Sequence, residues 1–122
     1  MIQHVTLEVR REDARAEASF WELLGFEPVE PPAAMAGRSL WVEHEGFQVH
    51  LAYEPEPLIP ERGHVALVAA DFAATVAALR AAGHPVDPRS EHWGAARVYA
   101  RTPAGHTVEV MAAPPPGTRS GG

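Results

Sequence analysis

The chain has no cysteine and no lysine among its 122 residues. The lack of cysteine excludes disulfide bonds, zinc sites built on thiolates and a thiol nucleophile. Long apolar stretches are also missing: no run approaches the roughly 18 residues that a membrane-spanning helix needs, and the N-terminus lacks the apolar core of a signal peptide. We therefore expect a cytoplasmic protein with no membrane partner, and the length predicts one compact domain.

Positive charge is scarce. The chain carries 10 basic residues, all arginine, against 16 acidic residues, for a formal net charge of −6. Apart from Arg10-Arg11 the arginines are scattered singly, whereas a nucleic-acid-binding protein usually carries a basic face. We therefore expect a small molecule rather than nucleic acid as the partner, and the hydrophobic fraction of 46% is enough for a packed core.

The first half of the chain has the pattern of strand, helix and hairpin. Apolar and polar residues alternate over 4–9, which predicts a half-buried strand. Residues 13–24 then predict a helix that ends at Gly25 and buries Ala16, Phe20, Leu23 and Leu24. A short extended segment is expected over 27–30, and two runs over 40–53 predict a hairpin around His44-Glu45-Gly46.

The second half repeats this pattern after a proline-rich linker, 54–63. A strand is predicted over 64–68, a helix capped by Asp71 up to Gly83, an extended segment over 85–87 and a hairpin over 97–111. The repeat predicts a single α+β domain over residues 1–113, made of a first module, 1–53, the linker, and a second module, 64–113. Residues 114–122, rich in proline and glycine, are expected to be a disordered tail.

The two copies match at four polar positions. His4 and His50 are 46 residues apart (50 − 4), and His64 and Glu109 are 45 apart (109 − 64). In each of these strands the flanking valine or leucine must cover the helix, so the two-residue period places all four side chains on the other face. A curved sheet with its helices outside turns that face into a concave cup. The alternative is four separate polar residues on a solvated sheet face.

Three imidazoles and one carboxylate form a suitable ligand set for a divalent ion such as Fe²⁺, Mn²⁺, Co²⁺, Ni²⁺ or Zn²⁺. We therefore predict a metal site made by His4, His50, His64 and Glu109. A six-coordinate ion would keep two positions for adjacent substrate oxygens and would act as a Lewis acid. Glu109 and His50 are the candidate catalytic residues, His50 as a base if it leaves the metal.

Three further side chains are candidates for binding the substrate. Arg97 and Tyr99 share a strand face that parity directs into the cup, where Arg97 could pair with a carboxylate or phosphate. Trp41 could stack on a flat ligand. The alternatives are a salt bridge at the rim and an ordinary packed aromatic side chain. The other histidines fall in turns or loops and are expected to be solvated: His44, His84, His92 and His106. The alternative for His92 is a place at the rim of the cup.

At these residues the chain resembles the vicinal oxygen chelate superfamily, which includes glyoxalases, extradiol dioxygenases, fosfomycin-resistance transferases and bleomycin-resistance binding proteins. The resemblance covers residues 2 to about 112. It rests on four segments in the family's order: Ile2-Gln3-His4-Val5, Phe20-Trp21 followed by Leu24-Gly25-Phe26, His64-Val65-Ala66-Leu67, and Gly105-His106-Thr107-Val108-Glu109-Val110.

The resemblance implies two tandem βαβββ modules that form an eight-stranded, cup-shaped mixed sheet around a divalent metal ion. It matches His4, His64 and Glu109 with the family's ligands on the first, fifth and eighth strands. His50 departs from the pattern, because glyoxalases and related isomerases usually carry Glu or Gln at this fourth-strand position, and this weakens a glyoxalase assignment. Many members pair two chains, and short modules leave sheet edges uncovered, so we expect a homodimer.

Two functions from different classes remain open. One is a metal-dependent enzyme of the lyase, isomerase or dioxygenase type, acting on a small molecule chelated through adjacent oxygens. The other is a metal-free binding protein that sequesters a drug or natural product, as bleomycin-resistance proteins do. The sequence identifies neither the substrate nor the metal.

Overall fold

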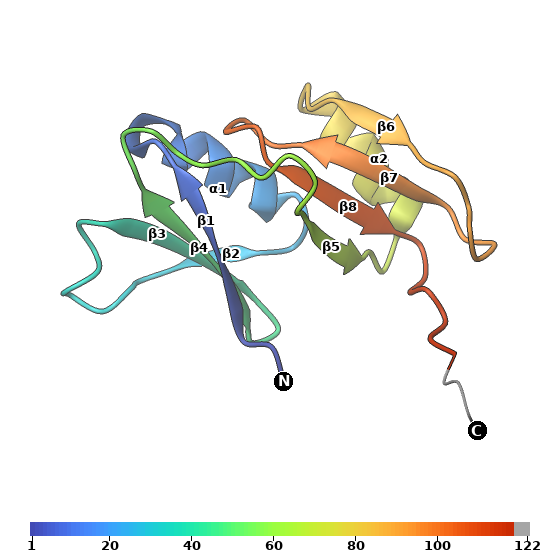
Figure 1. The fold of residues 1–122 in the computed structure, drawn as a ribbon, viewed down its shortest axis with the longest axis horizontal. Coiled ribbons are helices and arrows are strands. Elements are labelled where there is room, and N and C mark those ends of the chain that lie inside the picture. The colour runs from blue at the N-terminus through green and yellow to red at the C-terminus, as the bar shows by residue number, and fades with distance from the viewer. Residues whose placement is uncertain (119–122) are drawn as a thin grey trace. The chain divides into compact units, whose positions relative to one another are not determined.

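The computed structural model describes residues 1–118, and the last part of the expected tail, 119–122, lies outside the described residues. The chain divides into two compact units. The first unit comprises Met1–Gly63 together with Thr102–His106, and the second comprises His64–Arg101 and residues 107–118. Each unit contains one four-stranded sheet and one α-helix (Figure 1).

The first unit follows the predicted order of strand, helix and three strands. Its elements are β1 (His4–Val9), a 3₁₀ turn (Arg11–Asp13), α1 (Ala14–Glu22), β2 (Glu27–Val29), β3 (Ser39–His44) and β4 (Phe47–Tyr53). The strand order is β1-β4-β3-β2, with β1 parallel to β4 and the other pairs antiparallel. The β3–β4 hairpin turns at Glu45 and Gly46, whose φ angles of 50° and 83° are typical of a tight two-residue hairpin turn.

The second unit repeats this topology. Its elements are β5 (Val65–Val68), α2 (Phe72–Ala81), β6 (Val86–Pro88), β7 (Arg97–Arg101) and β8 (Thr107–Met111). The strand order is β5-β8-β7-β6, again with one parallel and two antiparallel pairs. The predicted cap of α2 is present, because the Asp71 carboxylate accepts a hydrogen bond from Ala74 N. The predicted pair of βαβββ modules is therefore confirmed.

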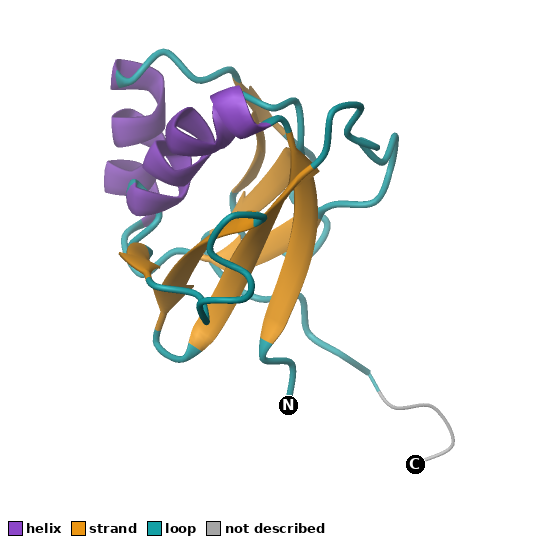
Figure 2. Ribbon diagram, turned by 90° about the vertical axis from the view of Figure 1, so that its left-hand side faces the viewer, coloured by secondary structure: helices purple, strands orange, loops and turns teal. Residues whose placement is uncertain are grey.

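In each unit the helix packs against one face of the unit's own sheet (Figure 2). The strand residues that face the helix form the core: Val9, Val49 and Leu51 in the first unit, and Val108 and Val110 in the second, have 0% exposure. The other face of each sheet carries the polar residues of the same strands and is called the open face below. Neither helix of residues 1–118 has the length and apolar character to cross a bilayer.

Helix α1 buries a different stripe from the one expected. Ala16 is exposed, and the fully or nearly buried residues are Ala14, Glu17, Ala18 and Trp21, together with Phe20. Positions 14, 17, 18 and 21 have the spacing of one helix face. The sequence pattern did not reveal this face because it includes Glu17, and glutamate side chains are usually exposed to solvent.

Glu17 is buried because the turn between β7 and β8 supplies its partner. Its carboxylate Oε1 accepts a hydrogen bond of 2.8 Å from Ala104 N. In the same turn His106 is buried, with 4% exposure, and its Nε2 donates to the backbone oxygen of Glu8 at 2.8 Å. The expectation that His106 is solvated is therefore wrong: its ring satisfies a strand carbonyl that the sequence pattern could not assign.

Burial raises the pKa of the Glu17 carboxyl above its usual value of 4.5, although the Ala104 bond and the nearby His106 act in the opposite direction. An acid whose pKa is higher in the folded state stabilises the fold most below pH 4.5, and this contribution is lost as the pH rises through the raised pKa. Ionised Glu17 therefore lowers the free energy of unfolding at neutral pH.

We predict that Glu17→Gln, which keeps an oxygen acceptor for Ala104, becomes more stable relative to the wild type as the pH rises from about 4 to 8. Glu17→Ala removes the acceptor and should lower the free energy of unfolding by about 1–3 kcal/mol. Urea unfolding at several pH values measures both effects. Glu22→Gln, on the exposed side of the same helix, is the control. A pH dependence that is the same in wild type and Glu17→Gln would contradict this account.

Candidate metal and ligand site

The open face of the first sheet carries a stack of aromatic rings. His50 is paired in register with Thr6 on one side and with Trp41 on the other. The His50 and Trp41 rings are stacked, with centroids 3.7 Å apart and an interplanar angle of 2°. The rings of His4 and His50 are stacked at 4.1 Å and 14°. Two of the predicted ligands are thus in contact, and Trp41 packs against one of them.

A side-chain network orients these imidazoles. Glu43 Oε1 accepts a hydrogen bond from Gln48 Nε2 at 2.8 Å, which directs the Gln48 amide oxygen toward His50 Nε2, also 2.8 Å away. Because an amide oxygen can only accept, Nε2 of His50 carries the proton and its lone pair is on Nδ1. His4 Nδ1 is likewise 2.7 Å from Gln3 Oε1, which leaves its lone pair on Nε2.

The charge state of His50 follows from its position. Burial lowers the pKa of His50 below its usual value of 6.5, and the neighbouring His4 acts in the same direction. His50 is therefore neutral at physiological pH. A neutral imidazole with a fixed tautomer is the form that binds a metal ion.

The open face of the second sheet joins the other two predicted ligands. His64 Nε2 lies 3.1 Å from Glu109 Oε1. The second carboxylate oxygen of Glu109 pairs with Arg97 Nη1 at 3.2 Å. Glu109 is more enclosed than strand parity alone predicts, with only 7% of its surface exposed. The buried carboxylate is stabilised by its contacts with the Arg97 guanidinium and the His64 imidazole.

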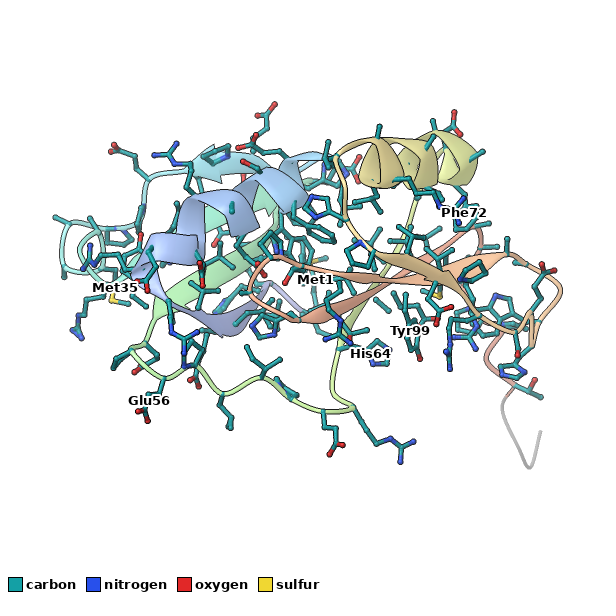
Figure 3. The ribbon with its side chains drawn as sticks, turned by 90° about the horizontal axis from the view of Figure 1, so that it is seen from above. Met1, Met35, Glu56, His64, Phe72 and Tyr99 are labelled. Atoms are coloured by element: carbon teal, nitrogen blue, oxygen red, sulfur yellow. The ribbon has the colours of Figure 1, made fainter. Side chains whose placement is uncertain are left out.

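Arg97 and Tyr99 lie on this face as predicted. The ring of Tyr99 is 5.3 Å from that of His64, and the two side chains are seen side by side in Figure 3. The guanidinium group of Arg97 is already paired within the protein. In addition to its ion pair with Glu109, its Nε donates a hydrogen bond to Ser90 O at 2.7 Å, and its side chain is only 9% exposed. Its guanidinium also lies 5.5 Å from the centroid of the Trp93 ring.

The structure therefore brings the four predicted ligands together as two pairs, His4 with His50 in the first unit and His64 with Glu109 in the second. Within residues 1–118, no three His, Asp or Glu side chains are grouped closely enough to hold a metal ion. The sequence pattern did not single out the orienting residues Gln48 and Glu43. The position of Gln48 two residues before His50, hence on the same face, was the signal that could have identified it.

A cavity of about 210 Å³ opens beside the ring stack in the first unit. Trp41, His50, Tyr53 and Met35 are among the residues that line it. The charged side chains of Arg38 and Glu54 also line this cavity, so that its aromatic wall lies beside polar groups that could orient a small organic molecule. Trp41 lines this cavity, and its ring also packs against that of His50.

Comparison with solved structures shows the fold. A protein of Bacillus anthracis provisionally assigned to the glyoxalase family has a TM-score of 0.81 at 22% identity, with 91% of this chain and 93% of that chain covered. Lactoylglutathione lyase of Agrobacterium tumefaciens has a TM-score of 0.69 at 24% identity, covering 91% and 92%. The oxidase ChaP-H2 has a TM-score of 0.72 at 22% identity, covering 93% and 94%. At such identities the likeness concerns the fold alone.

No curated protein sequence matches the chain significantly. The family comparison is decisive, since the model of one family matches residues 1–110, nearly the whole described chain. The repeated βαβββ topology and the relatives with the same fold agree with this match. The chain belongs to the Glyoxalase/Bleomycin resistance protein/Dioxygenase superfamily.

Proposed function

We propose that this protein binds a divalent transition-metal ion through His4, His50, His64 and Glu109. The ion would serve chemistry of the lyase, isomerase or dioxygenase type on a small molecule chelated through two adjacent oxygens. One observation carries the proposal: potential ligands occur in contact at equivalent places in the two modules, His4 with His50 and His64 with Glu109.

The donor chemistry supports a metal ion. The amide oxygens of Gln3 and Gln48 fix the tautomers of His4 and His50, as outer ligands commonly do for metal-binding histidines. Three neutral nitrogens and one carboxylate oxygen suit Fe²⁺, Mn²⁺, Co²⁺, Ni²⁺ or Zn²⁺. When bound, the ion would supply Lewis-acid stabilisation of a substrate carbonyl or enolate oxygen.

The protein's own residues have separate parts in this proposal. Arg97 holds one oxygen of Glu109 and so orients the carboxylate toward His64. His50, whose lowered pKa keeps it neutral, can accept a proton from the substrate if its ring is not bound to the metal. Trp41 offers a flat surface for the substrate, and Tyr99, next to Glu109 in the register, offers a hydroxyl group.

A second function, sequestration of a drug or natural product without metal, is favoured by the cavity beside Trp41 and His50. Its aromatic wall could hold a planar molecule by stacking alone. Both functions use the open faces of the sheets, and they differ in whether Glu109 is required. A metal titration therefore separates them.

We predict that the metal-stripped protein binds at least one of the five ions in calorimetric titration, and that Glu109→Gln weakens binding by on the order of 100-fold or more, since it removes the one negative ligand. Binding should be lost as the pH falls through about 6, where free imidazoles take up protons in competition with the metal.

His44→Gln is the matched control, because His44 is exposed at the end of β3, on the strand face opposite to that of Trp41. Its metal affinity should equal that of the wild type. If no ion binds, or if Glu109→Gln and wild type bind equally, the metal proposal fails and sequestration becomes the leading function.

We also propose that the protein is a homodimer. Large apolar side chains remain exposed on the chain, with Ile2 at 76%, Leu58 at 74% and Val68 at 46%. Val68 lies on β5, an edge strand of its sheet, whose outward backbone groups can pair with another chain. A second copy would cover such surface.

Light scattering at micromolar concentration should therefore give about twice the chain mass of 13.2 kDa. Val68→Lys should shift the protein toward the monomer, whereas Ala73→Lys, on the exposed side of α2, should not. A wild-type protein that stays monomeric would refute the dimer. Mixing His4→Ala with Glu109→Ala chains then reports whether a metal site draws ligands from two chains, because only in that case does mixing restore binding.

A further inference from the structure

The strand residues on the open faces of the two sheets differ in charge, although the folds of the two sheets are alike. The charged strand residues on the first open face are all acidic: Glu8, Glu27 and Glu43. Those on the second face include two cations: Arg97 and Arg101, beside Asp87 and Glu109. Arg89, directly after β6, adds a third, because its guanidinium lies 4.7 Å from the centroid of the Tyr99 ring on this face. In a chain with a net charge of −6, this is a local concentration of positive charge.

The ion pair between Arg97 and Glu109 cancels the charge nearest the predicted metal ligands. Both side chains are about nine-tenths buried, at 9% and 10% exposure, and their atoms are 3.2 Å apart. Glu109 therefore repels a neighbouring anion much less than an unpaired carboxylate would. The other charged residues of this face are Arg89, Arg101 and Asp87, whose formal charges sum to +1 (2 − 1).

These three residues line one cavity of about 240 Å³ in the second unit. Its other walls are Pro85, Tyr99, Ala100 and Thr107. Arg89 pairs with Asp87 at 3.1 Å, but the two side chains are 44% and 70% exposed. An ion pair so exposed is weak, so Arg89 can turn to another anion at little cost. The hydroxyl groups of Tyr99 and Thr107 add neutral donors at the same wall.

We propose that this cavity binds an oxyanion, the carboxylate or phosphate of a small molecule, between Arg89 and Arg101. A guanidinium group matches both anions through paired N–H donors. The cavity adjoins the predicted metal ligand, since Tyr99 is the register partner of Glu109 and Thr107 lies two residues before it on the same face. If the proposed function is correct, this anion is part of the metal-chelated substrate. The substrate is then an anionic molecule with two adjacent oxygens.

The test uses the full chain stripped of metal with EDTA and then dialysed. Inorganic phosphate and malonate are added separately at constant ionic strength, while NMR follows the side-chain Nε–H signals of Arg89 and Arg101. We expect saturable shifts with at least one probe, and the tighter of the two identifies the preferred group. Arg89→Gln or Arg101→Gln should weaken binding about tenfold, and Arg101→Lys, which keeps the charge, should weaken it less.

Arg15→Gln and Arg80→Gln, on exposed positions of α1 and α2, are the controls and should bind like the wild type. Thermal melting verifies that each variant is folded, and Arg101→Lys keeps the test valid if Arg101→Gln does not fold. The proposal is overturned if neither probe saturates, or if Arg89→Gln and Arg101→Lys bind both probes as tightly as the wild type. Because no metal is present in this titration, a negative result would count against the anion site and would say nothing about the metal site.

Discussion

The two-residue period of the β-strand is the constraint on which the candidate site depends. His50 lies between Val49 and Leu51, which are fully buried under the helix, and Glu109 lies between Val108 and Val110 in the same way. A shift of either strand by one residue would move its buried apolar side chains to the open face and turn the imidazole or carboxylate toward the core. Burial of an unpaired charge is costly, so the pattern specifies the register and the chemical face together.

The two modules share one topology but carry different functional groups on their open faces. The first carries stacked imidazoles whose tautomers are fixed by amide oxygens, with Trp41 against them. The second carries a carboxylate held between an arginine and an imidazole. Neutral nitrogen donors and an oriented carboxylate oxygen are complementary as metal ligands, and the arginines around Tyr99 are suited to an anion. The difference between the modules is thus as informative as their likeness.

Much of this could be predicted from the sequence, because it depends on local rules. Strand alternation, the Asp71 cap and the Glu45-Gly46 turn each act over a few residues, and the repeat extended them to both modules. It also predicted which face holds the four polar residues. The repeat shows that the four polar residues occupy equivalent positions in the two modules, but it gives no distances between their side chains. For this reason the sequence could not show that these residues form two contacting pairs.

The failures concern contacts that no local rule describes. Glu17 meets Ala104 across 87 residues, and His106 meets the Glu8 carbonyl across 98. A glutamate on a helix and a histidine in a turn look solvated until the partner is known. The role of Arg97 was incomplete for the same reason: its second partner, Ser90 O, lies in a loop without a periodic pattern. Sequence patterns do not predict which polar side chains are buried, because the burial of each one depends on a hydrogen-bond partner that is distant in the sequence.

The proposed function requires that His4, His50, His64 and Glu109 together bind one metal ion. Metal analysis of the protein purified without an affinity tag or chelator tests it most directly. We expect about one divalent transition-metal ion per chain in the wild type, and a metal content reduced several-fold in Glu109→Gln. A wild-type protein whose metal content does not exceed that of its buffer, or equals that of Glu109→Gln, would contradict it.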